Sequence, residues 1–362
     1  MKISIYTIAL NEEKFVERFM SSIKNEADDI YVLDTGSTDK TVQALQDLGA
    51  NVKVGITKPW RFDTPRNVSL AMVPENTDIC LSIDLDETLT PGWRKCLEDS
   101  WLPETTRMRY QYAWSHNADG SPATCFWYDK CHQRKNYRWV KPVHEVLTIY
   151  NQHEVQNFCD GFMLHHWPDP TKSRGSYLPL LELAVKEEPY DDRSCHYLGR
   201  EYMYYGAYDQ AIVELKRHLS LPSATWDSER AASMRFIARC YTYKHDLANA
   251  HIWALKSCAE QPNEREPWFE MVKVGYYLKD FEMIFHACKQ LFKFTDKGRS
   301  YISDPDAWGY LPHDYYALAA WNLRLKQIAM DQGLLAVQIA ERTINDPDTI
   351  ARLKTNLSFY TA

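Results

Sequence analysis

Carboxylates stand close together at one point of the chain where they could bind a cation or move a proton. Asp84-Leu85-Asp86 follows the buried run 79–83, and Glu87 comes directly after it. Successive side chains of an extended segment alternate in direction, so Leu85 points away while both aspartates share one side. Such a pair of carboxylates is what a hard divalent cation requires. Capping of the following helix would need fewer acids, and we therefore predict a metal site.

Two more polar clusters follow apolar runs nearer the N-terminus. They are Asn11-Glu12-Glu13, after the run 3–9, and Asp34-Thr35-Gly36-Ser37-Thr38-Asp39, after the run 30–33. Gly36 permits a tight turn, and the residues after it can cap a helix while leaving backbone N–H groups near an anion. Taken singly, each cluster is explained by a helix start. Taken together at the carboxyl ends of parallel strands, they predict one ligand site.

The elements that must position these residues follow a β-α-β-α-β order. Apolar runs at 3–9, 30–33 and 52–54 alternate with helical periodicity from about Glu12 and from Thr38, and the run 79–83 precedes a helix that starts near Thr90-Pro91-Gly92. From about 106 to 166 the pattern changes to strands, with a turn at 117–120. This pattern predicts an α/β layered sheet over residues 1–170, with a boundary near 168–175.

Residues 171–362 have helical periodicity and an internal repeat. The first copy fits a tetratricopeptide helix pair, in which small residues let two helices approach closely. It is marked by Leu198, Gly199, Tyr202, Gly206, Tyr208, Ala211 and Leu215. Later copies are marked by Ala238, Tyr241, Ala250 and Pro262, by Trp268, Phe281 and Ile284, and by Ala319, Ala336, Ala340 and Pro347. We predict an all-α solenoid, with an irregular helical bundle as the alternative.

Composition excludes several classes of protein. With 362 residues, 45% of them hydrophobic, and a formal net charge of −7, the chain is neither disordered nor attracted as a whole to nucleic acid or acidic membranes. No window has the roughly 18 uninterrupted apolar residues that a membrane span needs. The nine cysteines are odd in number and form no CxxC pair, so they predict reduced thiols in a cytoplasmic protein and no zinc site.

The segment 126–141 reverses the overall charge, because it holds five Lys and Arg residues against one acid, interleaved with aromatic residues. Cationic side chains can hold phosphates while aromatic rings stack on bases or sugars. The candidates for acceptor binding are Arg134, Lys135, Arg138 and Trp139. The alternative is a solvated hairpin with ordinary cross-strand pairs.

The motifs over residues 1–170 together resemble the family 2 glycosyltransferases of the GT-A fold. The resemblance is carried by Asn11-Glu12-Glu13, by 32–41 with Asp34-Thr35-Gly36-Ser37-Thr38-Asp39, by Phe62-Asp63-Thr64-Pro65-Arg66-Asn67, and by Ile83-Asp84-Leu85-Asp86-Glu87. The repeats behind it look like the tetratricopeptide extension of some of these enzymes. The resemblance implies a nucleotide-diphosphate sugar as donor, with UDP the commonest carrier, and inversion at the anomeric centre.

The resemblance also implies roles for single residues. Asn11, Glu12 and Asp34, together with the turn residues Gly36 and Ser37, would hold the nucleoside side of the donor. Arg66 would approach the base or the diphosphate, and Asp84 the ribose or the sugar. Asp86 would hold Mn²⁺ or Mg²⁺, which neutralises charge on the leaving diphosphate.

A base and a further metal ligand complete the expected site. Glu145, in the stretch Trp139-Val140-Lys141-Pro142-Val143-His144-Glu145, is the candidate that takes the proton of the acceptor, and His144 is the alternative base. Family members often present a late histidine to the metal. Of the adjacent pair His165-His166 we predict His165 in this role, with an interdomain hydrogen bond as the alternative.

The sequence therefore predicts a metal-dependent inverting glycosyltransferase with a hydroxyl acceptor. Because solenoids present extended surfaces, the acceptor is expected to be a macromolecule: a hydroxymethylated DNA base, a glycan core or a protein. The competing hypothesis is a catalytically silent adaptor that binds a nucleotide-sugar and uses its repeats for protein interaction.

Overall fold

The computed structural model describes residues 1–171, 175–298 and 300–361, and the chain divides into two compact units. The first unit comprises Met1–Ser115 and Thr124–Leu180, and the second comprises His116–Ala123 and Leu181–Ala362. Residues 172–174, inside the predicted boundary region, lie outside the described residues. We describe each unit by itself.

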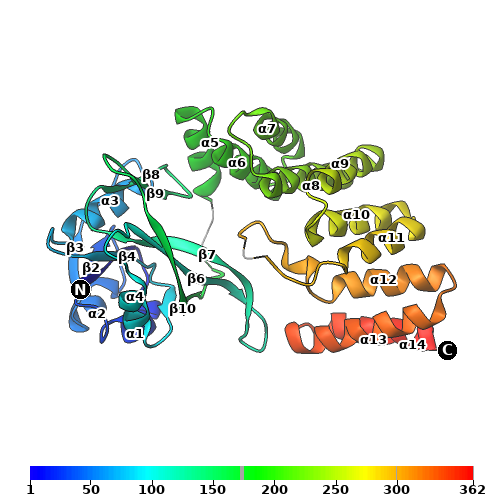
Figure 1. Ribbon diagram of the computed structural model, residues 1–362, viewed down its shortest axis with the longest axis horizontal. Coiled ribbons are helices and arrows are strands. Elements are labelled where there is room, and N and C mark those ends of the chain that lie inside the picture. The colour runs from blue at the N-terminus through cyan, green and yellow to red at the C-terminus, as the bar shows by residue number, and fades with distance from the viewer. Residues whose placement is uncertain (172–174, 299, 362) are drawn as a thin grey trace. The chain divides into compact units, whose positions relative to one another are not determined.

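The first unit is built on an eight-stranded mixed sheet (Figure 1). The strand order is β3-β2-β1-β4-β7-β6-β10-β5, and β1 pairs in parallel with both β2 and β4. The strands are β1 (Ile3–Ala9), β2 (Asp29–Asp34), β3 (Asn51–Val54), β4 (Ile79–Ser82), β5 (Glu87–Leu89), β6 (Arg107–His116), β7 (Pro122–Gln133) and β10 (Gln156–His166). A separate two-stranded sheet joins β8 (Tyr137–Val140) to β9 (Val146–Ile149).

Helices and the small sheet cover both faces of the large sheet. The helices of this unit are α1 (Glu13–Ile23), α2 (Thr41–Asp47), α3 (Asp63–Met72), α4 (Trp93–Ser100) and α5 (Tyr177–Glu187), of which α5 runs into the second unit. Alternation along β1 separates two cores. Ile3 and Ile5 pack with α1, α2 and α4, whereas Tyr6 packs with α3, β8 and β9.

The sheet has a topological switch point between β1 and β4. The chain runs from β1 to β2 and β3 on one side, and then returns to place β4 on the other side of β1. Loops at the carboxyl ends of parallel strands separate at such a point and leave room for a ligand. The loops that follow β1 and β4 hold Asn11-Glu12 and Asp84-Leu85-Asp86, so the predicted site residues flank the switch point.

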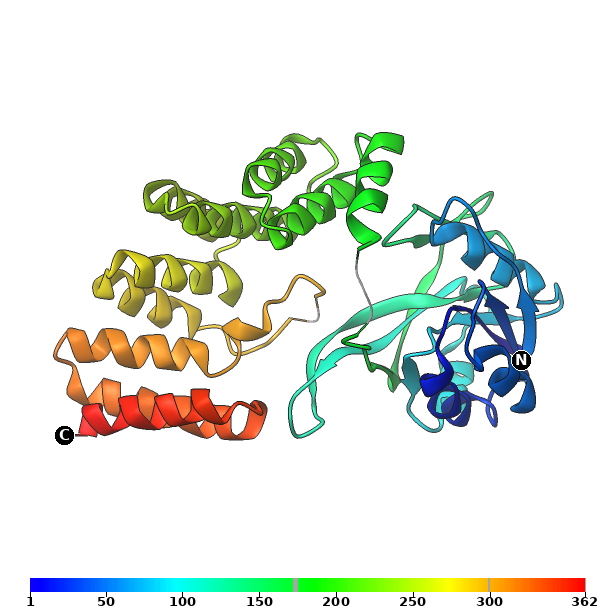
Figure 2. The same cartoon turned by 180° about the vertical axis from the view of Figure 1, so that it is seen from behind.

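The second unit is a stack of helix pairs, which Figures 1 and 2 show as successive layers. The pairs are α6 (Asp192–Tyr204) with α7 (Tyr208–Ser220), α8 (Asp227–Tyr243) with α9 (Leu247–Glu260), α10 (Arg265–Leu278) with α11 (Phe281–Leu291), and α12 (Leu311–Asn322) with α13 (Lys326–Thr343). A short turn of 3₁₀-helix, η1 (Pro305–Ala307), precedes α12, and α14 (Pro347–Thr361) follows the last pair. The predicted α/β sheet followed by helical repeats is confirmed.

A glycine sets the spacing of the first helix pair. A Cβ atom added at Gly199 of α6 would lie 2.5 Å from Leu215 Cγ of α7, closer than real Cβ contacts allow. Leu215 and Ala211 are fully buried. The small residue at 199 therefore permits the close approach that the repeat pattern predicted. Among the described helices, none is both long and apolar enough to cross a membrane.

Candidate active site

Arg66 of α3 joins two carboxylates at the switch point. Its guanidinium donates from Nε to Glu145 Oε1 at 2.5 Å, and its Nη1 lies 2.8 Å from Asp84 Oδ1. Arg66 is buried, and its guanidinium lies 5.1 Å from the centre of the Trp139 ring. A buried arginine has to be paired, and here it holds the loop after β4 and the loop before β9 in one arrangement.

Lys130 of β7 adds a second buried cation beside the same aspartate. Its Nζ lies 3.4 Å from Asp84 Oδ2 and 4.9 Å from the centre of the Tyr128 ring. Burial opposes the ionisation of Asp84, but the charges of Arg66 and Lys130 outweigh it and hold the pKa of Asp84 below its usual value. Asp84 is therefore ionised at neutral pH. We call Arg66, Asp84, Lys130 and Glu145 the Arg66 cluster.

Glu87 is a carboxyl group of this region whose pKa is raised. Its Oε2 accepts from the Asp84 backbone N–H at 2.8 Å, and its Oε1 accepts from the Tyr112 hydroxyl at 2.7 Å. Burial, with the negative charges of Asp84 and Asp86 added, raises the pKa of Glu87 to about 7. Two neighbouring acids thus have pKa values moved in opposite directions, which is typical of functional sites.

Asp86 meets a histidine from the last strand of the sheet. His166 Nε2 lies 3.5 Å from Asp86 Oδ2, and His166 Nδ1 lies 3.1 Å from the Trp114 carbonyl oxygen. Burial opposes protonation of His166, but Asp86 outweighs it and raises the pKa of that histidine. Trp167 donates its backbone N–H to the Asp86 carbonyl oxygen at 2.8 Å, which fixes the end of β10 beside the Asp84-Leu85-Asp86 loop.

The structure favours the other of the two adjacent histidines as the partner of Asp86. We predicted His165, but His166 is the one whose ring nitrogen reaches Asp86, since successive strand residues face opposite ways. His165 instead stacks against Trp167, with ring centroids 5.9 Å apart. A carboxylate oxygen and an imidazole nitrogen 3.5 Å apart are close enough to share one ion at ligand distances of about 2.1 Å. The donor set therefore fits a divalent cation.

The loops after β1 and β2 are bound to each other. Asn11, whose φ is 54°, accepts from the Thr38 N–H at 2.8 Å and donates its own N–H to Ser37 Oγ at 2.8 Å. Asp34 is buried and accepts from the Gly36 and Ser37 N–H groups at 3.0 and 2.8 Å. Gly36 has a φ of 118°, which favours glycine.

Glu12 completes this pair of loops. Its side chain is buried, and its backbone N–H donates to Thr41 Oγ1 at 2.7 Å. All five predicted donor residues of the two loops, Asn11, Glu12, Asp34, Gly36 and Ser37, therefore lie in one connected structure at the carboxyl edge of the sheet.

Of the four residues predicted to bind the acceptor on the basic segment 126–141, Trp139 is the one whose side chain is buried. Trp139 is 2% exposed, and its indole N–H donates to the Tyr6 hydroxyl at 2.9 Å, so its ring is part of the core and is not available to an acceptor. Arg134 donates from Nε to the Val73 carbonyl oxygen at 2.8 Å. Lys135 and Arg138 are exposed, as an acceptor contact requires.

His144 lies beside Glu145 on the loop between β8 and β9. It has a φ of 48°, and its ring centroid lies 5.7 Å from that of Tyr177. The ion pair with Arg66 thus distinguishes Glu145 from its neighbour.

Sequence reasoning missed Lys130 and His166 as site residues. The basic character of 126–141 was a signal for Lys130, but only strand pairing could single it out.

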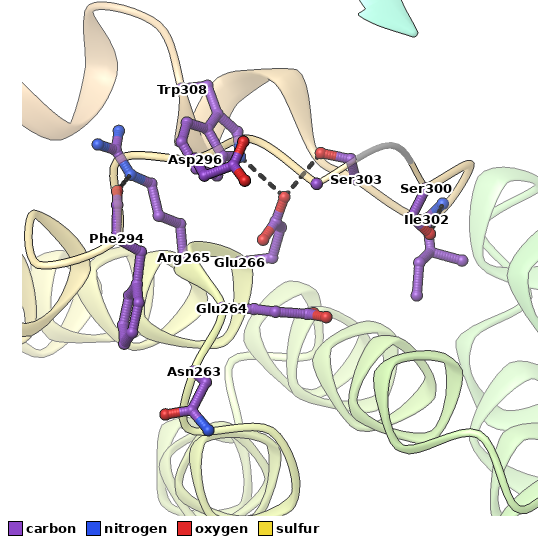
Figure 3. A pocket seen from close by; sticks show the side chains of 11 residues that line it. Asn263, Glu264, Arg265, Glu266, Phe294, Asp296, Ser300, Ile302, Ser303 and Trp308 are labelled. Atoms are coloured by element: carbon purple, nitrogen blue, oxygen red, sulfur yellow. Dashed lines mark hydrogen bonds between the residues drawn. The ribbon is translucent and has the colours of Figure 1, made fainter. Parts of the chain in front are cut away.

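The described residues also enclose a cavity of about 180 Å³ in the second unit, which Figure 3 shows from close by. Glu266 lies at its wall and accepts from Ser303 Oγ at 2.8 Å and from the Trp308 indole N–H at 2.9 Å. These bonds tie the loop before α12 to the start of α10. All of its lining residues belong to the second unit, so it is separate from the cluster on the sheet.

Comparison with known proteins finds sequence similarity in both parts of the chain. Residues 4–101 match the family described as Glycosyl transferase family 2. An uncharacterized glycosyltransferase of Rickettsia bellii is 32% identical over 160 residues, which cover 43% of this chain and 53% of the relative. A TPR repeat-containing protein of Synechococcus elongatus is 30% identical over 216 residues, covering 55% of this chain and 51% of that protein. The chain thus spans about half the length of each of these relatives.

Two solved structures are similar to parts of the chain. Glucosyl-3-phosphoglycerate synthase from Mycobacterium tuberculosis, in complex with Mg²⁺ and uridine-diphosphate, is 28% identical, with a TM-score of 0.27 over 31% of this chain and 43% of that one. MamA is 14% identical, with a TM-score of 0.37 over 45% of this chain and 86% of that one.

Proposed function

We propose that this chain, which carries a family 2 glycosyltransferase domain of GT-A-like fold and a tetratricopeptide-like helical region, transfers a sugar from a nucleotide-diphosphate sugar to a hydroxyl group of a macromolecular acceptor. One observation carries the proposal. The family 2 domain gathers Asp86, Arg66 and Glu145 at the switch point of its sheet, where α/β sheets bind ligands. We propose residues 1–170 as the catalytic domain and 171–362 as the domain that shapes or recruits the acceptor.

Asp86 and His166 would hold the divalent cation, Mn²⁺ or Mg²⁺. The cation would offset the negative charge that grows on the diphosphate as the sugar leaves. His166 Nδ1–H donates to the Trp114 carbonyl oxygen, which orients the ring toward Asp86. The hydrogen bond from Trp167 to the Asp86 carbonyl oxygen holds the loop that carries Asp86 beside the end of β10 that carries His166.

The donor would lie between the loops after β1, β2 and β4. Glu12 and Asp34 supply carboxylates for ribose and base, with Asn11, Gly36 and Ser37 shaping the turn around them. Asp84 would contact the ribose or the sugar. UDP is our expectation for the carrier. Arg66 is buried against two carboxylates, so we assign it as a positioning residue that holds Asp84 and Glu145 in place.

Glu145 would act as the base of an inverting transfer. It accepts the proton of the acceptor hydroxyl as that oxygen attacks the anomeric carbon from the face opposite the diphosphate. Arg66 Nε holds Glu145 Oε1 at 2.5 Å and leaves Oε2 for the proton. Loss of a positioned base lowers turnover by about 10²–10⁴-fold, so Glu145→Gln tests this role, with His144→Asn as the test of the alternative.

Lys135 and Arg138 would contact the acceptor, because both are exposed on the basic segment. An anionic acceptor, such as DNA with a hydroxymethylated base or a phosphorylated glycan core, agrees with their charge, and a protein acceptor agrees with the repeats. Salt-dependent binding that is weakened in Lys135→Ala and Arg138→Ala would favour the anionic acceptors over a protein. A cytoplasmic location remains part of the proposal.

The first experiment is a donor screen. Purified chain, Mn²⁺ and a panel of nucleotide-sugars are incubated, and release of nucleoside diphosphate is measured with and without chelator. Release with one donor, lost on chelation and in Asp86→Ala, is the expected result. Asp99→Ala is the matched control, since Asp99 is an exposed aspartate of α4 paired only at the surface with Lys95. Absence of both release and thermal shift with every donor would overturn the proposal and favour the adaptor hypothesis.

A further inference from the structure

A buried histidine in the second unit points a ring nitrogen at two carboxylates. His218, in the last turn of α7, is fully buried. Its Nε2 lies 3.4 Å from Glu229 Oε1, longer than an ordinary hydrogen bond, and makes no hydrogen bond to the described residues. Asp192 provides the third group, and the ligand atoms of Asp192, His218 and Glu229 all lie within 4.8 Å of one another.

These three residues come from three different helices of the repeat. Asp192 is the first residue of α6 and is partly exposed, whereas Glu229 stands in the first turn of α8 and is buried. Residues 192 and 229 are 37 positions apart, so local chain geometry does not bring their two carboxylates together. Their convergence on one imidazole nitrogen therefore results from the packing of α6, α7 and α8.

The other nitrogen of His218 is held by a chain of hydrogen bonds. His218 Nδ1 lies 2.9 Å from Ser233 Oγ, and Ser233 Oγ lies 2.8 Å from His196 Nδ1. With an ion on Nε2, His218 Nδ1–H would donate to Ser233 Oγ, and the serine hydroxyl would in turn donate to His196 Nδ1. Metal-bound histidines are oriented by such a partner on the second nitrogen.

Glu229 is also prepared as an anion. Its Oε2 accepts from the Tyr301 hydroxyl, which leaves Oε1 on the side of His218. A hydrogen bond donated by a hydroxyl group stabilises the ionised form of the carboxylate. A deprotonated carboxylate is the form that binds a metal.

We propose that Asp192, His218 and Glu229 form a binding site for a divalent transition-metal ion, with Zn²⁺ as the expected occupant. One imidazole nitrogen and two carboxylate oxygens are a donor set that Zn²⁺ accepts, with water in a fourth position. An imidazole nitrogen gains more from Zn²⁺ than from Mg²⁺ or Ca²⁺, which prefer oxygen ligands. The two negative charges of the carboxylates would also cancel the two positive charges of the ion, which lowers the free energy needed to bury them.

The bound ion would fasten the loop before α12 to the first repeat. Tyr301 belongs to that loop and is linked to the site through Glu229, and its ring stacks on Tyr197 of α6 with centroids 6.1 Å apart. The site would thus be structural. It lies in the helical unit and serves no step of the sugar transfer, so it stands independently of the proposed function.

The test measures zinc in the full chain carrying Asp86→Ala, which removes the aspartate of the candidate cation site on the sheet. The protein is stripped with chelator, exposed to Zn²⁺, desalted, and analysed for bound metal and for its melting temperature. We expect one Zn²⁺ per chain and a higher melting temperature with the ion. Co²⁺ should give visible absorption bands, whereas Mg²⁺ should neither raise the melting temperature nor compete.

Variants of the ligands decide whether these residues hold the ion. Asp192→Asn is the mild variant, because Asp192 is partly exposed, and it should weaken Zn²⁺ binding about tenfold or more. His218→Ala should abolish binding, and Ser233→Ala should weaken it by about 10–100-fold. Asp209→Asn, an exposed aspartate of α7 paired with Lys244, is the matched control and should bind as the parent does. Zinc content and affinity that are equal in the parent, Asp192→Asn and His218→Ala would overturn the site. Absence of both retained zinc and a thermal shift in the parent would also overturn it.

Discussion

Removing the charge of Arg66 is the perturbation whose cost follows most directly from the structure. Arg66→Met keeps an apolar stem over Trp139 but leaves Asp84 and Glu145 without the guanidinium that lies 2.8 and 2.5 Å from them. Breaking a buried ion pair by removing one partner costs about 3–5 kcal/mol. At about 2–4 °C per kcal/mol for a unit of this size, the melting temperature of the first unit should fall by roughly 6–20 °C.

Arg61→Met is the matched control for this experiment. Arg61 also pairs with an aspartate, Asp63, and its Nε lies 2.6 Å from Asp63 Oδ1, but its side chain is 27% exposed. Because 10% of the Asp63 side chain is exposed, this pair is more open than the Arg66 pairs only on its arginine side, and its loss should cost less than the loss of Arg66. Both variants remove one guanidinium charge, at positions five residues apart. The difference between their losses of stability therefore measures what the burial of Arg66 contributes.

The dependence on pH gives a second test of the same reasoning. The pKa of Asp84 is held below its usual value, so the stabilisation from its ion pairs is present above the unfolded pKa and is lost as pH falls through the folded pKa. The difference in stability between wild type and Arg66→Met should therefore be largest near about pH 7 and narrow below about pH 4.

The assay is urea denaturation of the full chain at several pH values. Hydrogen exchange of peptides from β1 and β4 reports the first unit separately from the helical unit. The reasoning is refuted if Arg66→Met destabilises the first unit no more than Arg61→Met does. It is also refuted if the difference between wild type and Arg66→Met stays constant as pH falls.

Three further predictions follow from single contacts. The pKa of Glu87 is raised to about 7, so the stabilisation from its neutral form is present below the unfolded pKa and is lost as pH rises through about 7. The loss amounts to about 1.4 kcal/mol of unfolding free energy per pH unit. Denaturation curves of Glu87→Gln should not show it. Gly199→Ala should cost about 1–3 kcal/mol because its Cβ would meet Leu215, whereas Gly298→Ala, with open space around it, should cost little. The double variant Gly199→Ala/Leu215→Ala should lose less stability than the sum of the two single losses, because the clash is then absent. Asp86→Ala should abolish donor turnover yet change the melting temperature by no more than a few degrees, since Asp86 faces solvent in part; calorimetry showing a large loss would assign Asp86 to folding instead.

The fold followed from periodicity where each element buries its own apolar face. The strands at 3–9, 30–33 and 79–83 and the helix pair built on Gly199 are local patterns, and all of them are present. The turn at 117–120 lies between β6 and β7 as predicted. Short elements were missed because three residues carry too little pattern, as for β5 (Glu87–Leu89), which pairs with β10.

Site residues could be predicted from the sequence only where they directly follow a recognisable strand. Asp84 and Asp86 could be assigned to the loop after a buried strand, but which of His165 and His166 faces Asp86 could not, because the facing of β10 depends on its pairing with β5 and β6. Trp139 was wrong as an acceptor contact for a similar reason. Its face of β8 packs on Tyr6, a residue 133 positions away.

Strand pairing in the first unit has a consequence for how the chain folds. Ile3 pairs with Ile79 and Leu89 with Leu164, so the sheet depends on contacts between distant parts of the chain. The helix pairs of the second unit, in contrast, are formed by neighbours in sequence. Folding rates fall as contacting residues lie farther apart along the chain, so the helical unit should gain its structure faster on refolding from denaturant. During synthesis on the ribosome β1 emerges first, but the sheet is complete only after β10 has been made. Folding of the first unit is therefore delayed further.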